Sequence, residues 1–308
     1  MMRVTVRVPA TSANLGPGFD CLGLALDLYN TVTLDLASHP AQPHVDVHGE
    51  GHDRLPRSER NLALRSARRI LHTGARELFV QRVVLDNAIP VGGGLGSSAA
   101  AIAGAMIAAN AAVHPPFATD ELLRAALEFE PHPDNLAAAF YGGLTVAVLG
   151  PDGRPVVAPL APPLGLRAVV LTPNQSVSTH QSRAALPRVV AHGDAAYTVG
   201  RAALLVAALL TGRHDLLRPA MEDRLHQPYR VPDGSPSAAI MAAALAAGAS
   251  GAALSGSGPS ILALCAGPTG PVAAAMRESA ARSGLSARAR ELNIVASGAT
   301  VTSLSGDH

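Results

Sequence analysis

The first part of the chain alternates between apolar and polar residues over several short stretches. Alternation with a period of two places the apolar side chains on one face of a half-buried strand. The pattern occurs at residues 4–8, 22–28, 31–36 and 44–48. We therefore expect strands in these four places, most of them in an antiparallel sheet.

Other stretches have the spacing of a helix. Residues 61–71 are apolar at helical intervals with a basic outer face, and the small apolar residues at 97–113 predict a tightly buried helix. Further helices are expected near 119–128, 135–140, 179–211, 237–247 and 272–283, and further strands near 80–86, 144–149, 166–171 and within 252–264. This mixture predicts an α+β fold.

The length of the chain favours more than one domain. With 308 residues it exceeds an average domain and can bury a large core. Residues 151–165 are rich in proline and glycine, which is typical of a connection. We expect two closely packed domains, 1–155 and 156–308. The uncharged stretch 235–276 is interrupted by glycine and proline, which favours buried core over a membrane span.

A glycine-rich stretch at 92–96 lies between a predicted strand and the predicted helix at 97–113. Glycine allows positive φ and lets consecutive N–H groups come close to a ligand. We expect Ser97 or Ser98 to cap the helix, whose first N–H groups and positive dipole end face the same space. A glycine loop leading into a helix N-terminus is an anion site, most often for phosphate. A structural turn before a packed helix is the alternative.

The chain contains no lysine, since all 24 of its basic Lys and Arg positions are arginine. This absence reduces the number of phosphate-binding loop classes that the glycine-rich stretch can belong to. A Walker loop and a Schiff-base mechanism both require lysine and are excluded. The spacing Gly94-x-Gly96-x-x-Ala99 formally fits a dinucleotide fingerprint, but the acidic residue expected about twenty positions later would be Asp120, in a polar segment. A nicotinamide-dependent oxidoreductase therefore stays an alternative.

The composition restricts the possible partners. The formal net charge is +1, which indicates neither nucleic acid nor an anionic membrane as a partner. Aromatic residues make up 3% of the chain, with no tryptophan, which argues against stacking platforms for bases. The two cysteines, Cys21 and Cys265, exclude a disulfide framework and favour buried thiols in a reducing compartment. The first residues lack the apolar core of a signal peptide, so we expect a cytoplasmic protein.

Three stretches agree in order and spacing with the superfamily of small-molecule kinases that includes galactokinase, homoserine kinase, mevalonate kinase and phosphomevalonate kinase. They are Pro9 to Asp20, Pro90 to Ala100 and Leu254 to Ser260. Within that superfamily, four shorter segments resemble the homoserine kinases: Ala13 to Asp20, His132-Pro133-Asp134-Asn135, Tyr141-Gly142-Gly143 and Gln227-Pro228-Tyr229-Arg230. The resemblance covers most of the chain.

The resemblance implies a fold and a reaction. The fold would be α+β, with a ribosomal-S5-like, nucleotide-binding N-terminal half and a ferredoxin-like C-terminal half on the substrate side. The reaction would be ATP-dependent, Mg²⁺-assisted phosphorylation of the L-homoserine hydroxyl to O-phospho-L-homoserine, in threonine biosynthesis, by direct in-line transfer. L-Homoserine would be the small-molecule partner, and a homodimer is possible. Two competing hypotheses are a kinase that phosphorylates mevalonate or a sugar and a nucleotide sensor without catalytic activity.

The resemblance also implies roles for individual residues. Those near the chemistry would be Asn14, Asp20, Ser98, Glu130, His132 and Asp134. Asn61 would contact the nucleotide base, and the triphosphate would be wrapped by Pro90, Val91, Gly92, Gly93, Gly94, Leu95, Gly96, Ser97, Ser98, Ala99 and Ala100. Ser98 and Glu130 would hold the metal. The amino-acid substrate would face Asn14, Asp20, His132, Asp134 and Gly258, with its carboxylate held by Thr179, Arg183 and Arg230.

One position departs from the family pattern. Pro131 stands where the family usually has glycine between the glutamate and the histidine. Proline fixes its own φ and restricts the residue before it. Either Glu128 or Glu130 therefore remains a candidate for the metal ligand. Asp20 or Asp134 could orient the acceptor hydroxyl or take its proton, and neither is assigned as a general base.

Overall fold

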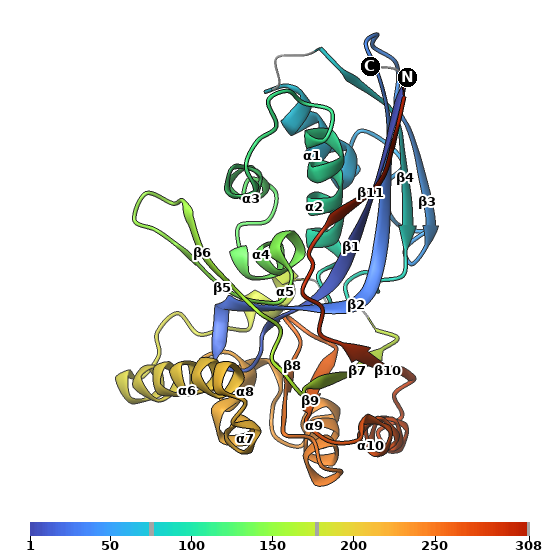
Figure 1. Cartoon of the computed structure of the whole chain (residues 1–308). Helices are drawn as coiled ribbons and strands as arrows, with labels where there is room; N and C mark the ends of the chain where they lie inside the picture. Colours follow the sequence, from blue (N-terminus) through green and yellow to red (C-terminus); the bar gives the residue numbers. More distant parts are fainter. Residues whose placement is uncertain (74–76, 176–178, 307–308) are drawn as a thin grey trace.

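The computed structural model describes residues 1–73, 77–175 and 179–306. Within these residues the chain forms two sheets, each with helices packed against it (Figure 1). The expected α+β class is confirmed. The two chain ends lie side by side in Figure 1 because the last strand pairs with the first.

The first sheet is built around two long neighbouring strands. These are β1 (Met2–Asn14) and β2 (Gly18–Ala37), which pair antiparallel. The described strands of this sheet follow the order β11-β1-β2-β4-β3, and β5 also pairs with β2 and in turn with β6. The bounds of the other strands are β3 (His44–Gly49), β4 (Phe79–Asn87), β5 (Leu144–Leu149), β6 (Pro155–Leu160) and β11 (Thr300–Ser305). Apart from β3 with β4, the pairs are antiparallel, as expected.

Two details of this sheet differ from the sequence-based expectation. The strands expected at 22–28 and 31–36 are one continuous strand, β2. The strand expected at 4–8 extends much further, since β1 pairs with β2 as far as Asn14 and Gly18. The stretch 151–165 contains β6, which pairs with β5. The division of the chain at 155 stays a prediction.

Helices cover one face of the first sheet (Figure 1). They are α1 (Leu62–Leu71), α2 (Ser97–Asn110), α3 (Thr119–Ala126) and α4 (Pro133–Tyr141). A Cβ on Gly104 of α2 would lie 2.7 Å from Val32 and 2.9 Å from Val8, so the helix backbone lies directly on the sheet. The small residues of α2 therefore permit a close approach that large side chains would prevent.

The second sheet has the order β10-β7-β9-β8 among the described strands, with all pairs antiparallel. Its strands are β7 (Arg167–Pro173), β8 (Gly251–Leu254), β9 (Ile261–Cys265) and β10 (Ala287–Asn293). Helices α9 (Pro236–Ala246) and α10 (Thr269–Arg282) pack against it, and every residue of β9 is buried. The remaining helices are α5 (Thr179–Ala184), α6 (His192–Thr211), η1 (His214–Leu216), α7 (Leu217–Ala220) and α8 (Gln227–Arg230).

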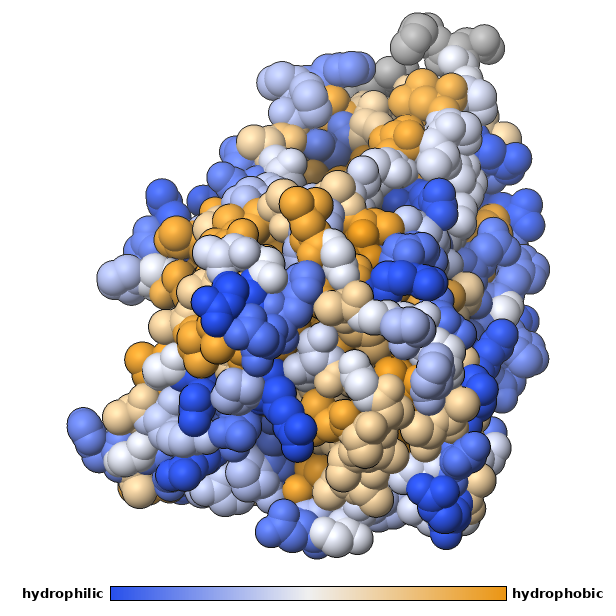
Figure 2. Space-filling view, turned by 60° about the horizontal axis from the view of Figure 1, so that its bottom comes forward, coloured by the Kyte–Doolittle hydropathy of each residue, from blue (hydrophilic) through white to orange (hydrophobic). Residues whose placement is uncertain are grey.

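Among the described helices, α6 is long and apolar enough to cross a membrane by length and composition, with 22% of its most apolar window buried. One such helix is weak evidence for a membrane span, because apolar helices of this length also occur in proteins without one. Figure 2 shows apolar surface interspersed with polar groups on the face drawn there. The uncharged stretch 235–276 folds as α9, β8, β9 and the start of α10. The expected core is found in β8 and β9, whereas only Ile240 and Ala244 of α9 are buried.

Candidate functional site

A cavity of about 450 Å³ opens where the first sheet meets the second. It collects most of the residues that the sequence singled out. The predicted site residues that line it are Asn14, Asp20, Asn61, Val91, Gly92, Gly93, Gly94, Gly96, Ser97, Ser98, Glu130, His132, Asp134, Arg183 and Arg230. These residues come from β1, β2, α2, α4, α5, α8 and the segments before α1, α2 and α4.

Other predicted residues lie beside this cavity without lining it. Leu95, Ala99 and Ala100 are fully buried in the hydrophobic core, where they support the loop. Pro90 lines a second, different cavity. A Cβ on Gly258 would lie against the side chain of Leu254, whereas Gly256 and Ser257 of the same turn line the first cavity. Thr179 begins α5, but its side chain lies outside the described residues.

The glycine loop is held by close contact with the second glycine-rich turn. Gly92, Gly94 and Gly96 have φ of 69°, 76° and 68°, in the left-handed region that favours glycine. A Cβ on Gly94 would lie 2.3 Å from the carbonyl oxygen of Ser255. The Ser255 hydroxyl donates to the carbonyl oxygen of Gly94 over 2.6 Å. The loop therefore tolerates no side chain at this point.

The first turn of α2 is open toward the cavity. The expected cap by Ser97 or Ser98 is wrong: Gly96 occupies the N-cap position in a left-handed conformation, and no side chain caps the helix. The first N–H groups of a helix have no partner within it. With Ser97 and Ser98 lining the cavity, these groups and the positive end of the helix dipole are available to an anion.

Asn61 caps helix α1 at the edge of the same cavity. Its Oδ1 accepts from the backbone N–H groups of Ala63 at 3.0 Å and Leu64 at 3.3 Å, so it caps α1. Its Nδ2 donates to the carbonyl oxygen of Pro56 over 2.7 Å. An Nδ2 group carries two hydrogens, and one is left for a ligand. Asn61 therefore fixes the segment that forms this wall and still offers one donor.

The choice between the two glutamates follows from their neighbours. Glu130 accepts from the Ser98 hydroxyl over 3.3 Å and lies 3.1 Å from Nδ1 of His132, and all three line the cavity. Glu128 instead pairs with Arg69 at 2.7 Å on the surface, and this hydrogen-bonded arginine lowers the pKa of the Glu128 carboxyl. Of the two, Glu130 is the carboxylate that faces the site.

Asp134 is a buried carboxyl near the start of α4. It is 4% exposed, and its Oδ1 accepts from the backbone N–H of Asn135 over 2.6 Å. Burial raises the pKa of Asp134 to about 7, although the Asn135 hydrogen bond opposes the shift. The negative charge of Asp20 adds to the increase. Asp134 therefore changes its charge near neutral pH.

Two arginines from distant segments meet Asp20 at the other end of the cavity. Arg183 of α5 forms an ion pair with the Asp20 carboxylate, and the guanidinium groups of Arg183 and Arg230 each lie 5.3 Å from the centre of the Phe19 ring. Burial, together with the charge of Arg183, lowers the pKa of Arg230. The Nε of Arg183 is buried and has no hydrogen-bond partner among the described residues. Both groups are thus placed to receive an anion.

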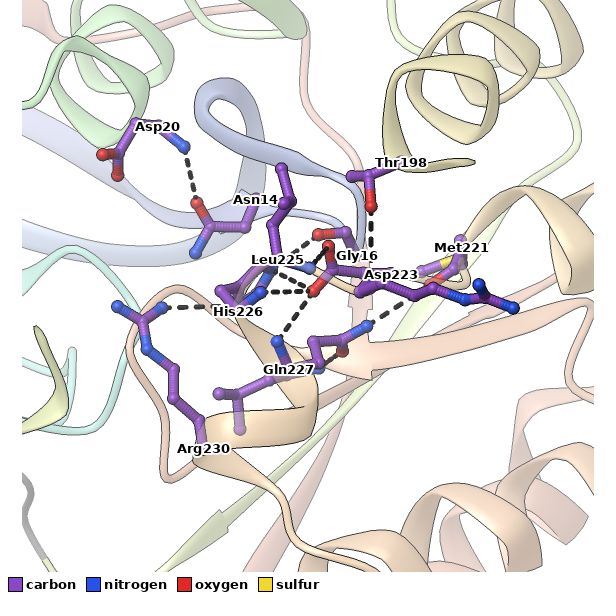
Figure 3. A network of polar contacts seen from close by, with 12 residues as sticks. Asn14, Gly16, Asp20, Thr198, Met221, Asp223, Leu225, His226, Gln227 and Arg230 are labelled. Atoms are coloured by element: carbon purple, nitrogen blue, oxygen red, sulfur yellow. Dashed lines mark hydrogen bonds and ion pairs between the residues drawn. The ribbon is translucent and has the colours of Figure 1, made fainter. Parts of the chain in front are cut away.

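A buried network that the sequence did not reveal supports Arg230 (Figure 3). Nε2 of His226 lies 2.6 Å from the carbonyl oxygen of Gly16, so this nitrogen carries the proton and donates. The other nitrogen, Nδ1, then accepts from Arg230 over 3.3 Å. Asp223 accepts from the backbone N–H groups of His226 and Gln227 at 2.9 and 2.7 Å, which fixes the start of α8. The network joins the β1–β2 turn to the arginine.

The turn between β1 and β2 has an unusual backbone. Asn14, Leu15 and Asp20 have φ of 71°, 50° and 57°, which non-glycine residues rarely adopt. Asn14 maintains this geometry, because its Nδ2 donates to the carbonyl oxygen of Gly256 over 2.8 Å and its Oδ1 accepts from the Asp20 N–H over 3.0 Å. Such strain persists where the surroundings hold it and is frequent at functional sites.

Sequence analysis missed several lining residues. They are Leu55, Pro56, Arg60, Leu62, Ala63, Leu85, Asn87, Ala101, Gly256 and Ser257. Gly256 and Ser257 lie in the stretch Leu254 to Ser260 that carries part of the resemblance, but no role was expected of them individually. Leu55, Leu62 and Leu85 form an apolar wall near Asn61, and apolar side chains of this kind carry no local signal that separates a ligand wall from core.

Family models match both halves of the chain. Residues 61–143 match the GHMP kinases N terminal domain, and residues 205–287 match the GHMP kinases C terminal model. The first match contains the glycine loop, Glu130 and Asp134. The second contains the Asp223–His226 network and Arg230.

Curated proteins and solved structures are similar over nearly the whole chain. A homoserine kinase of Moorella thermoacetica is 42% identical over 297 residues, which cover 96% of this chain and 99% of that protein. The crystal structure of a homoserine kinase from Cytophaga hutchinsonii superimposes with a TM-score of 0.88 at 30% identity, covering 97% of each chain. A mevalonate kinase of L. major in complex with R-mevalonate has a TM-score of 0.70 at 15% identity over 95% of this chain, a likeness of fold alone.

Proposed function

This chain belongs to the homoserine kinases of the GHMP kinase family, and we propose from that premise that it transfers the γ-phosphoryl group of ATP to the side-chain hydroxyl of L-homoserine, giving O-phospho-L-homoserine. The observation that carries the proposal is a single cavity with two kinds of lining. One end offers open backbone N–H groups and a helix N-terminus, and the other offers two arginines beside carboxylates. This pairing suits a polyphosphate and an amino acid held side by side.

The glycine-loop end would bind the nucleotide. Amides from Gly92 to Ser98 and the dipole of α2 would receive the phosphates, since no lysine is present to do so. The apolar wall of Leu55, Leu62 and Leu85 would cover the base, with the free Nδ2 hydrogen of Asn61 as a polar contact. This arrangement stabilises negative charge on the transferred group without covalent chemistry.

Ser98 and Glu130 are suited to hold Mg²⁺. Mg²⁺ prefers hard oxygen ligands and usually binds one or two protein groups together with substrate phosphates and water. A hydroxyl and a carboxylate 3.3 Å apart, at the anion-binding end of α2, match that requirement. The described residues hold no cluster of three or more His, Cys, Asp or Glu side chains that could hold a metal ion by themselves. When bound, Mg²⁺ neutralises charge on the phosphate oxygens.

The arginine end would bind the amino-acid group of L-homoserine. Arg230 and Arg183 would hold its α-carboxylate, since guanidinium groups pair with carboxylates in a fixed geometry. Asn14, Asp20 and His132 would surround the rest of the substrate. Asp134, with a pKa raised to about 7 by burial, would orient the acceptor hydroxyl and accept its proton at neutral pH.

Two further parts of the proposal concern the surroundings of the enzyme. We place it in the cytoplasm, because the two cysteines of the chain, Cys21 and Cys265, are free thiols, which suits a reducing compartment. We propose a homodimer from the resemblance to the family, and measurement of the molar mass in solution tests it.

ADP release with ATP and L-homoserine, compared with mevalonate and galactose at equal concentration, tests the function. L-Homoserine is expected to give turnover at least a hundredfold above the other two, because neither carries the zwitterion that the arginine end is built to receive. Equal or greater turnover with mevalonate or galactose would refute the choice of substrate. ATP binding without ADP release from any acceptor would instead support a nucleotide sensor.

A further inference from the structure

A second cavity, of about 290 Å³, lies beyond the glycine loop and is not used by the proposed reaction. Val91 and Gly93 line both this cavity and the first one, so the loop separates them. The charged side chains around the second cavity are Glu50, Arg54, Arg288 and Arg290. They come from the segment after β3, which belongs to the first sheet, and from β10 of the second sheet.

The charges in this cavity are unbalanced. Three guanidinium groups face one carboxylate, a formal excess of two positive charges. Nη1 of Arg290 is buried and has no hydrogen-bond partner among the described residues. A buried donor that is left without an acceptor costs about 1–3 kcal/mol, and more when it is charged. The cavity therefore presents a cationic donor with no acceptor supplied by the described part of the protein.

The strand geometry forces two of these arginines together. Arg288 and Arg290 are two residues apart on β10, where they pair with Thr172 and Val170 of β7. Residues i and i+2 of a strand point to the same face, so the two side chains share one side of the sheet. Burial lowers the pKa of Arg290, and the like charge of Arg288 lowers it further. Glu50 offsets only part of this repulsion.

The third arginine completes a concave wall. Nη2 of Arg54 donates to the carbonyl oxygen of Val91 over 3.2 Å, which fixes the guanidinium group at the glycine loop. Its remaining N–H groups are free to serve a second acceptor. Asn174 at the end of β7 adds a polar side chain to the lining. Its Nδ2 donates to the Ser286 hydroxyl over 2.8 Å, so the amide is already oriented.

We propose that this second cavity binds a small phosphate-bearing anion, held by Arg54, Arg288 and Arg290. A phosphate carries close to two negative charges at neutral pH, which matches the excess of two positive charges, and its oxygens accept from guanidinium groups in a bidentate manner. Inorganic phosphate and a small phosphomonoester such as O-phospho-L-homoserine share this chemistry. An anion here would contact the loop that closes the first cavity and would link the two sheets.

Isothermal titration of the full chain tests the proposal. The nucleotide site is first saturated with a non-hydrolysable ATP analogue and Mg²⁺, and inorganic phosphate or O-phospho-L-homoserine is then titrated, each in a separate arm. We expect one further site for phosphate, weakened about tenfold or more in Arg288→Gln/Arg290→Gln, as the loss of charge-assisted hydrogen bonds predicts. Arg277→Gln, at an exposed arginine of α10, is the matched control and should bind as the wild type does.

The outcomes separate the possibilities. Tighter binding of the phosphomonoester than of phosphate identifies an organic phosphate as the ligand, and equal or weaker binding identifies free phosphate. Absence of a phosphate site with the nucleotide site filled, or binding unchanged in the double variant, would overturn the proposal. The single variant Arg288→Gln serves as a second test, because Arg288 is exposed and its replacement leaves the core unchanged. Weaker phosphate binding in this variant would support the proposal even if the double variant did not fold. The inorganic phosphate arm does not depend on which alcohol the enzyme phosphorylates. Binding of the phosphomonoester is assigned to the second cavity only where Arg288→Gln weakens it, because the arginine end of the first cavity stays open to that ligand.

Discussion

The two ends of the first cavity have different kinds of lining. From Gly92 to Ser98 the lining consists of backbone and two serine hydroxyls. At the other end, the contacts are charged side chains from four separate segments: Asp20 of β2, Asp134 of α4, Arg183 of α5 and Arg230 of α8. The first end comes from one continuous stretch of chain, whereas the second is assembled by the tertiary structure.

This difference determines how each end can fail. A backbone N–H cannot be removed by changing a side chain, so the glycine-loop end is damaged when an atom is added. The arginine end is damaged when a side chain is removed or when the support of Arg230 by His226 and Asp223 is lost. Substitutions that add or remove atoms therefore test the comparison directly.

The largest effect is expected at Glu130, between the two ends. Glu130→Gln should lower kcat by about 10²–10³-fold, because the variant loses a charge that supports the transferring group, while the fold is kept. Steady-state kinetics and circular dichroism measure both. Glu128→Gln is the control and should keep near-normal turnover, since Glu128 pairs with Arg69 on the surface. An equal loss in both variants would contradict the assignment of Glu130.

Adding one carbon to the glycine loop should have the next largest effect. Gly94→Ala would place a Cβ 2.3 Å from the Ser255 carbonyl oxygen at a φ of 76°. We expect kcat/KM for ATP to fall about a hundredfold and the free energy of unfolding to fall by about 2–4 kcal/mol, from overpacking and the left-handed backbone together.

Gly153→Ala isolates the backbone part of this effect. Gly153 has a φ of 75° but no atom within 4 Å of its Cβ position. The Gly153→Ala variant should lose only about 1–2 kcal/mol of its free energy of unfolding and should keep the wild-type kcat and KM. If chemical denaturation gave the same loss for both variants, close packing of the loop would not be what Gly94 provides.

Removing a guanidinium group should affect only the other end. Arg230→Leu is expected to raise KM for L-homoserine by about 10–100-fold, as loss of a charge-assisted hydrogen bond predicts, with little change in KM for ATP. Arg224→Leu is the nearby control, because Arg224 forms an ion pair with Asp194 on the surface. A KM for L-homoserine that does not change in Arg230→Leu would remove the carboxylate role.

The last expected effect concerns the dependence of stability on pH. Asp134 has a folded pKa of about 7, above the ordinary value near 3.9, so between these values the folded state binds more protons than the unfolded state. Its contribution to stability is therefore full below about pH 4 and is lost as the pH rises to about 7, with a slope of at most about 1.4 kcal/mol per pH unit.

Chemical denaturation from pH 4 to 8 checks this slope. In Asp134→Asn the slope should be smaller than in the wild type, whereas Asp152→Asn, at an exposed position, should leave it unchanged. A wild-type slope that persists in Asp134→Asn would show that another group is responsible.

Local patterns in the sequence were sufficient for the parts of the molecule that depend on neighbouring residues. Period-two alternation found β3 and the first part of β1, and helical spacing found α1. The glycine loop was recognisable because its φ angles and its position before a helix are properties of one short stretch. The same patterns failed at β2, where the two expected strands form one strand. Its hydrogen bonds to β1, β4 and β5 keep the backbone extended through the residues between 28 and 31, where the alternation is interrupted.

The arginine end shows what only the tertiary structure decided. Arg183 meets Asp20 across 163 positions of the chain, and His226 meets Gly16 across 210. The choice of Glu130 over Glu128 depends on Ser98 and Arg69, which lie on other elements. Sequence by itself determined most of the secondary structure and the glycine loop before α2, because backbone preferences and short-range hydrogen bonds act over a few residues. The charged site and the second cavity required the packing of the two sheets, because only that packing brings charges together from segments whose local patterns are independent.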